Sequence, residues 1–241
     1  MAYSVTDLAA SHGDPAALRR FQAISPLDDA SIEALRKAID GATPTAVRRE
    51  LMSEGQEIFG KRILVSGWAA RVRLLADGRR QLISFLVPGD LFGNCGHSRP
   101  LAVSTVLALT AVAAADVPEG GNSQSLREAY EVSRAIEEAH LLAQITRLGR
   151  LSALERIADL LLELCERLTL AGLAQNGRFL LPLTQEVVAD ALGLTSVHLS
   201  RTLQTARRNG DFEWRDGQVH LPDPERLARK VGRLPVRVSN R

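Results

Sequence analysis

The sequence predicts an α+β protein in which a small antiparallel β-barrel or jelly roll is followed by a long helix and a C-terminal winged helix-turn-helix. Three observations predict this order. Two short helical segments meet at a glycine between Leu183 and Leu203, and an alternating hairpin pattern follows from Asp211 to Leu221. Short strands separated by glycine turns account for the residues from about Thr45 to Asp116.

The first observation concerns the stretch from Leu183 to Leu203. Thr184 is suited to cap a first helix, because its hydroxyl can accept hydrogen bonds from the free amides of the first turn. Gly193 can adopt the left-handed conformation that ends this helix and redirects the chain. Thr195 or Ser196 then caps a second helix. Two short helices joined in this way are typical of a helix-turn-helix, whose second helix enters the major groove of DNA.

The second observation is the hairpin that comes directly after these helices. The segment turns at Asp216-Gly217, a dipeptide strongly favoured in two-residue hairpin turns. A helix-turn-helix followed by a hairpin forms a winged helix. The alternative is an ordinary helical hairpin inside a larger domain, but the second helix carries polar and basic side chains suited to base edges. We therefore expect this part of the chain to bind double-stranded DNA.

Four side chains of the second helix are candidates for reading bases. Arg201 is expected to donate two hydrogen bonds to a guanine. Ser196 and His198 are expected to reach neighbouring bases, and Ser200 lies near the edge of the contact.

Other residues of the motif are candidates for holding the phosphate backbone. Thr184 and Gln185, at the start of the first helix, can present backbone amides to a phosphate, which the helix dipole favours. Arg207 and Arg208 add positive charge, unless they form only a solvated helix end.

The third observation concerns the N-terminal half. Residues 15–40 have helical spacing, and the strand-rich region that follows turns at Asp77-Gly78 and at Pro88-Gly89-Asp90. The loop at residues 117–123 is rich in glycine and proline and predicts a boundary. We therefore expect three units, which are a sensor domain at 1–120, a dimerisation helix at 121–149 and a DNA-binding domain at 150–241.

A helix is predicted from Ser123 to about Leu148. One narrow seam follows its length at near-heptad spacing, and it is formed by Leu126, Ala129 or Tyr130, Ser133, Ile136 or Glu137, His140, Ala143 or Gln144, and Leu148. Large apolar residues are few in this seam, so a helix buried within one domain is an alternative. Two-fold dimers bring two recognition helices to half-sites one DNA turn apart. We therefore expect this helix to pair with that of a second copy.

The composition excludes several classes of protein. A hydrophobic fraction of 45% is too high for a disordered chain, and the net charge of +2 does not by itself indicate nucleic acid. No uncharged run reaches the ~20 residues of a membrane helix. The N-terminus shows no signal peptide, so a cytoplasmic protein without membrane association is expected. Five scattered histidines form no catalytic or metal-binding motif, so no catalytic residues, no metal and no enzyme activity are expected.

Taken in order, these motifs resemble the Crp/Fnr family of bacterial transcription regulators over residues 20–230. The resemblance is most specific at 151–227, where the helix-turn-helix and the Gly210–Gly217 wing are similar to those of the family. In the N-terminal half, Pro88-Gly-Asp-Leu-Phe-Gly93 resembles part of the glycine pattern of its cyclic-nucleotide-binding barrel. The resemblance implies a homodimeric, sequence-specific regulator with RNA polymerase as a further partner. A ligand-binding or interaction module of the same fold that does not bind DNA is the alternative.

Two departures from the family pattern concern the effector pocket. Members that bind a cyclic nucleotide have a glutamate after the glycine that Gly93 resembles, and this chain has Asn94. They also have an arginine that holds the cyclic phosphate, where this chain has Ala102. A buried phosphate without its bidentate partner is strongly disfavoured. We therefore expect no binding of cAMP in the usual pocket, for which the candidate lining residues are Gly89, Gly93, Asn94, Ser104 and Thr105.

The two cysteines limit which cofactors are expected. The iron–sulfur members of the family have several N-terminal cysteines, whereas no cysteine precedes Cys95 here, so no cluster of that type is expected. Cys95 and His97 are too few to fill a tetrahedral metal site. Cys165 lies among leucines and is expected to be inert packing. An atypical small ligand, a thiol redox switch and constitutive activity all stay open for the sensor half.

Overall fold

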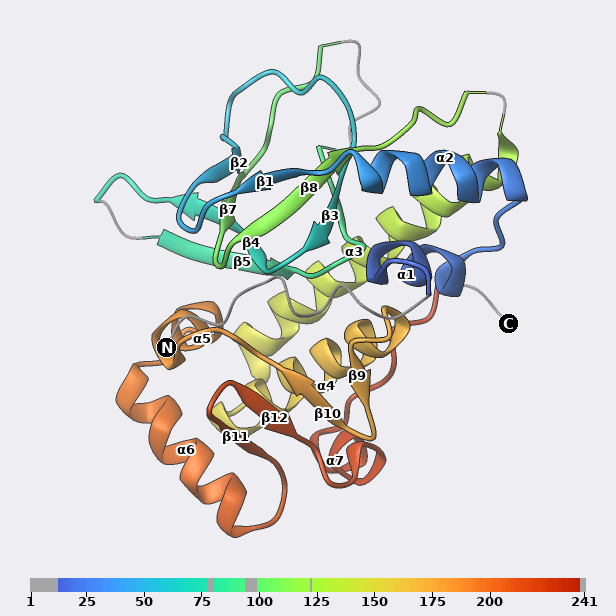
Figure 1. The fold of residues 1–241 in the computed structure, drawn as a ribbon. Coiled ribbons are helices and arrows are strands. Elements are labelled where there is room, and N and C mark those ends of the chain that lie inside the picture. Colours follow the sequence, from blue (N-terminus) through green and yellow to red (C-terminus); the bar gives the residue numbers. More distant parts are fainter. Residues whose placement is uncertain (1–12, 78–79, 94–98, 122, 239–241) are drawn as a thin grey trace.

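The computed structural model describes residues 13–77, 80–93, 99–121 and 123–238. A β-rich N-terminal half and a mostly helical C-terminal half lie one above the other, and a long helix, α3 (Gln124–Arg150), runs from the first to the second (Figure 1). The predicted order of elements is confirmed. Among the described residues, no helix is both long and apolar enough to cross a membrane.

The strands of the N-terminal half are short and antiparallel. They are β1 (Thr43–Thr45), β2 (Glu50–Met52), β3 (Arg62–Ser66), β4 (Ala69–Leu74), β5 (Arg80–Leu86), β6 (Leu91–Phe92), β7 (Thr105–Ala108) and β8 (Val112–Asp116). Two four-stranded sheets result, with strand orders β1-β8-β3-β6 and β2-β7-β4-β5. The two sheets do not close into one barrel, so the jelly-roll form of our prediction is the correct one. Their shared core contains Leu64, Phe92 and Val106, all fully buried.

Two helices precede the strands and pack on the start of α3. They are α1 (Ala16–Ile24) and α2 (Asp29–Asp40). The carboxylate of Asp28 caps α2 by accepting a hydrogen bond from the amide of Ser31 at 2.8 Å. The ring of Phe21 in α1 meets Tyr130 in α3 edge to face, with the ring centroids 6.1 Å apart. The N-terminal helices therefore fix where α3 leaves the jelly roll.

Most of the seam that we predicted for pairing with a second copy is buried within the protomer. Tyr130 is 3% exposed beside α1, and the amide of Gln144 donates to the carbonyl of Ala191 at 2.7 Å. Leu142 and Ile145 instead face outward, with 59% and 68% of their surface exposed. Gln144 and Glu137 of the seam contact polar groups of the same chain, and helical spacing alone does not distinguish such partners from those of a second copy.

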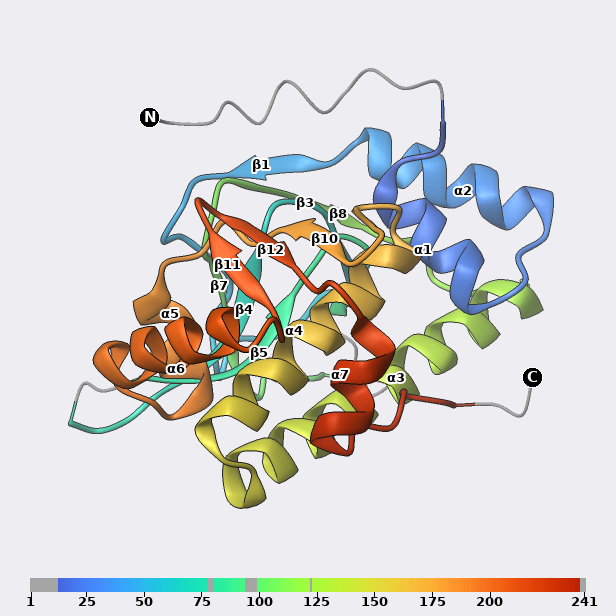
Figure 2. The same cartoon turned by 90° about the horizontal axis from the view of Figure 1, so that it is seen from below.

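The C-terminal half contains four helices and a small sheet. Its elements are α4 (Ala153–Leu170), β9 (Ala174–Gln175), β10 (Arg178–Leu180), α5 (Gln185–Leu192), α6 (Ser196–Arg208), β11 (Glu213–Arg215), β12 (Gln218–His220) and α7 (Pro224–Val231). The sheet has the antiparallel order β11-β12-β10-β9. Seen from below, α6 lies at the edge of the molecule, away from α1 and α2 (Figure 2).

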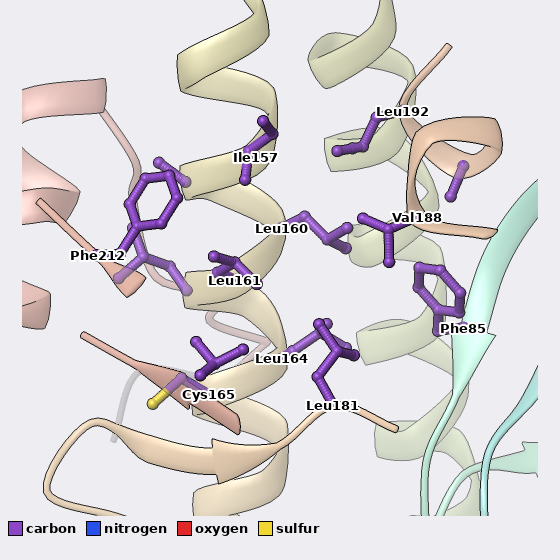
Figure 3. Packing of buried hydrophobic residues seen from close by; sticks show 14 of the residues in the cluster. Phe85, Ile157, Leu160, Leu161, Leu164, Cys165, Leu181, Val188, Leu192 and Phe212 are labelled. Carbon is purple, nitrogen blue, oxygen red and sulfur yellow. The ribbon is translucent and has the colours of Figure 1, made fainter. Parts of the chain in front are cut away.

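The two halves share one hydrophobic core. Phe85 of β5 is 4% exposed and belongs to the same cluster as Leu160 and Leu164 of α4. Val188 of α5 lies beside Phe85, so the helix-turn-helix is packed against the jelly roll (Figure 3). Full burial of such a side chain contributes roughly 1.5–3 kcal/mol. Such contacts stabilise the packing of the C-terminal half against the jelly roll.

A buried ionic network, which we call the joint, lies beside this core and is centred on Asp90. Its carboxylate lies 2.7 Å from Nη1 of Arg20 in α1 and also accepts a hydrogen bond from Arg167 in α4. Arg167 donates to Glu163 at 3.0 Å, and Glu163 also accepts from Arg147 of α3 at 2.6 Å. The nearby guanidinium groups lower the pKa of Asp90, and that of Glu163 to about 2, although burial alone acts to raise both.

The ionic network extends to the end of the chain. Arg147 donates to Asp159 at 2.7 Å, and Asp159 accepts from Arg233 at 2.8 Å. Arg233 also donates to Glu166 at 2.7 Å. These contacts fasten the segment after α7 to α4.

His140 of α3 borders a cavity of about 20 Å³ beside the joint. Burial, together with the positive charge of Arg167, lowers the pKa of His140 from 6.5 to about 4. The groups that act on it are Arg20 of α1, Asp90 after β5, and Glu163 and Arg167 of α4. His140 is therefore neutral in the folded protein at pH 7.

This burial predicts a loss of stability in mild acid. The unfolded chain binds a proton at His140 as the pH falls below 6.5, whereas the folded chain does so only near pH 4. The free energy of unfolding should therefore fall between these values, by an amount on the order of 3 kcal/mol. His140→Gln should flatten the curve of stability against pH from 6.5 to 5, measured by urea unfolding. Ser133 lines the same cavity, so Ser133→Ala serves as the control and should keep the wild-type slope. An unchanged slope in His140→Gln would contradict the assignment.

Candidate nucleic-acid interface

The turn between α5 and α6 has the geometry that the sequence predicts. The hydroxyl of Thr184 accepts a hydrogen bond from the amide of Val187 at 3.3 Å and so caps α5. Gly193 has φ 62° and ψ 37°, a left-handed conformation that costs other residues roughly 1–2 kcal/mol. The amide of Leu194 donates back to the carbonyl of Ala189 at 3.0 Å. These contacts end α5 and start the chain toward α6.

The second helix is capped by Thr195, whose hydroxyl accepts from the amide of His198 at 3.1 Å. This settles the choice between Thr195 and Ser196, and Ser196 becomes the first residue of α6. Leu199 and Leu203 are buried and hold α6 against the core. The opposite face is therefore left for solvent or a partner.

The exposed face of α6 brings together the side chains predicted to read bases. Ser196, His198 and Arg201 are exposed, and Ser200 is half-buried at the edge. The exposed face also contains Val197, which is 60% exposed and was not among the predicted contacts. Because this large apolar side chain is exposed beside polar recognition groups, Val197 is a further candidate for contact with a base.

The predicted phosphate contacts divide into two groups. Thr184 and Gln185 are exposed at the N-terminus of α5, where backbone amides are free. Arg207 and Arg208 are exposed at the other end of the motif, in the last turn of α6. Arg207 lies 3.9 Å from Glu213 of the wing, so this carboxylate partly neutralises the positive charge of Arg207.

The wing is the hairpin of β11 and β12, with Glu213 opposite His220 and Arg215 opposite Gln218. Asp216 and Gly217 both have positive φ angles, of 51° and 74°. A type I′ turn requires this, and it matches the twist of the two strands. Arg215 is exposed beside the turn. The hairpin predicted from the Asp-Gly dipeptide is therefore present.

Four of the five predicted effector-pocket residues lie within the described part of the chain, and Asn94 lies outside it. A side chain at Gly89 would meet Arg20 at 2.9 Å, so Gly89 serves close packing against α1. Thr105 accepts from the amide of Glu54 at 3.1 Å. Ser104 is buried, and its hydroxyl has no hydrogen-bond partner among the described residues. Gly93 borders a large open cavity, of about 690 Å³.

The structure describes one of the two cysteines. Cys165 is a buried free thiol, and burial raises its pKa, as expected for inert packing. Cys95 and His97 lie outside the described residues. Within the described ranges, no group of three or more histidine, cysteine or acidic side chains is arranged to hold a metal ion.

Comparison with known proteins agrees with this geometry. The Crp-like helix-turn-helix domain matches residues 155–230. The nitrogen fixation regulation protein FixK of Rhizobium meliloti (strain 1021) is 34% identical over 185 residues, which cover 74% of this chain and 82% of that protein. The transcriptional activator protein FnrL of Cereibacter sphaeroides is 31% identical over 180 residues, covering 70% and 71%. The structure of FixK2 from Bradyrhizobium japonicum is 28% identical, with a TM-score of 0.66 over 78% of this chain and 96% of that one. The chain therefore belongs to the Crp/Fnr family and is a DNA-binding transcription regulator, not an enzyme.

Proposed function

We propose that α6 reads the major groove of DNA as one half of a two-fold dimer. The observation that carries this proposal is the division of α6 into two faces. One face is buried through Leu199 and Leu203, and the other exposes His198 and Arg201. A solvent-exposed helix face of this kind, at the edge of the molecule, is free to enter a groove (Figure 2).

Each side chain on this face has a proposed partner. Arg201 donates two hydrogen bonds to O6 and N7 of a guanine. Ser196 and His198 contact the neighbouring bases, with Ser200 at the margin. The methyl groups of Val197 are suited to the C5 methyl of a thymine.

The remaining motif residues hold the backbone. Free amides at Thr184 and Gln185 donate hydrogen bonds to a phosphate at the positive end of the α5 dipole. Arg207, Arg208 and the wing residue Arg215 add charge that attracts phosphates without selecting sequence. RNA polymerase is proposed as the further partner of the DNA-bound protein.

We propose that the exposed stripe of α3 carries the dimer contact. Ala135, Glu138, Leu142 and Ile145 are all exposed and follow one another at steps of three and four residues. This is the spacing of a coiled-coil seam. Its large apolar members, Leu142 and Ile145, lie toward the C-terminal end of α3, near the DNA-binding half. The proposed functional units remain 1–120, 121–149 and 150–241.

The sensor half is proposed to act without cAMP in the usual pocket. Ala102 is 3% exposed, and its amide and carbonyl bond to the backbone of Gln56 and Gly55, each at 2.8 Å. An apolar, internally bonded residue at this position offers no cation to a phosphate. We also propose that the protein holds no iron–sulfur cluster, because no cysteine precedes Cys95.

The base-reading role of Arg201 predicts a selective loss. Arg201→Ala should weaken binding by ~1–3 kcal/mol and relax preference at one base pair, since a bidentate contact to guanine is lost. Gln185→Ala is the matched comparison, and it should weaken binding equally for all sequences. Selection of binding sites from a random library distinguishes the two. An unchanged preference in Arg201→Ala would contradict base reading, and a loss confined to one position in Gln185→Ala would contradict the phosphate role.

The proposed seam on α3 predicts a loss of self-association. Ile145→Glu places like charges at symmetric positions and removes apolar contact, so the dimer dissociation constant should rise at least ~tenfold, or ~1.4 kcal/mol. Sedimentation equilibrium measures this constant. Leu180→Glu changes another exposed apolar residue, 52% exposed in β10, and should leave the dimer intact. Self-association unaffected by Ile145→Glu would place the dimer contact elsewhere.

A further inference from the structure

Arg167 reaches from the DNA-binding half into the sensor half. It lies near the C-terminal end of α4, and only 6% of its side chain is exposed. It donates to the backbone carbonyl of Phe85 at 2.8 Å and to the carboxylate of Asp90. Both acceptors belong to the jelly roll, so one side chain ties the two halves together.

Asp90 is held in place on its own side of this contact. Its carboxylate accepts a hydrogen bond from the amide of Val87 at 2.6 Å, within the turn that follows β5. Gly89, with φ 93°, brings that turn against the side chain of Arg20. Arg20 is 2% exposed and pairs with the same carboxylate. Asp90 therefore presents a fixed anion to α4.

The helix α4 is held at two places along its length, one by α3 and one by the jelly roll. In the middle of α4, Asp159 and Glu163 pair with Arg147 of α3. Asp90 holds Arg167. Arg167 comes eight residues after Asp159, a separation of about 12 Å along the helix. A helix that is held by one contact can change its direction, whereas a second contact farther along the helix fixes that direction.

The direction of α4 determines where α6 lies. The helix-turn-helix packs on α4 through the shared core, in which Leu160, Leu164 and Val188 are buried together (Figure 3). Asp190 of α5 also lies 3.5 Å from Arg80 of β5. A change in the direction of α4 would carry α6 with it.

We propose that Asp90 and Arg167 are positioning residues that fix the distance and angle between the two recognition helices of the dimer. This inference rests on the proposed function, in which α3 pairs and α6 reads bases. The sensor half thereby takes part in DNA recognition without touching DNA. The quantity it sets is the preferred spacing of the two half-sites, and the bases within each half-site are set by α6.

The test separates spacing from base preference. The half-site selected by the wild-type protein is placed in inverted pairs whose spacers differ by one base pair, and affinities are measured at one salt concentration. The wild-type protein should prefer one spacer about tenfold over its neighbours. Arg167→Met removes the charged contact but keeps an unbranched side chain. It should select the same half-site bases and lose most of the preference among spacers.

One control variant removes an ion-paired arginine of α2 instead. Arg36→Met breaks ion pairs to Asp14 and Glu33 in the N-terminal half and should keep the wild-type spacing. If Arg167→Met does not fold, Arg167→Lys is tested in its place, because it retains the positive charge but loses the forked geometry of the guanidinium group. Arg167→Lys should then lose most of the preference among spacers. A folded variant of Arg167 with wild-type spacing preference would overturn the proposal. A wild-type protein without base preference would instead overturn the proposed function.

Discussion

The carboxylate of Asp90 lies between two guanidinium groups from different parts of the chain, Arg20 in α1 and Arg167 in α4. Buried charges are tolerated only when they are paired, so the positions of all three residues depend on one another. The shared core around Phe85 adds apolar contact between the same halves. The jelly roll, α3 and the helix-turn-helix are therefore parts of one packed body, and the exposed face of α6 is presented from a fixed base.

The elements that the sequence predicts well are those with local causes. The caps at Thr184 and Thr195 and the left-handed Gly193 each depend on residues within one turn. The wing follows from Asp216-Gly217, because few other dipeptides accept two positive φ angles in succession. The same locality explains why the recognition face of α6 was predicted almost completely. Val197 was missed because an apolar residue is ordinarily assigned to the core.

The contacts between the halves could not be predicted in this way. Asp90 and Arg167 are 77 residues apart, and nothing near either residue identifies its partner. The polar residues His140 and Gln144 on the inner face of α3 were attributed to a seam between copies. In the structure Gln144 donates to the carbonyl of Ala191 in α5, and His140 lines the cavity beside Asp90 and Arg167. Helical spacing predicts that one face of a helix is buried, and only the tertiary structure shows which residues bury it.

The most direct test of the account measures whether the two halves form one rigid body in solution. Spin labels are placed at cysteines substituted for Lys37 in α2 and Thr205 in α6, both exposed, with Cys95 replaced by serine and Cys165 left buried. Labelled chains are diluted with unlabelled protein so that only distances within a protomer are recorded by pulsed electron resonance. The account predicts one narrow distance distribution in the absence of DNA. A broad or two-peaked distribution would contradict it, because it would show that the DNA-binding half moves freely relative to the jelly roll.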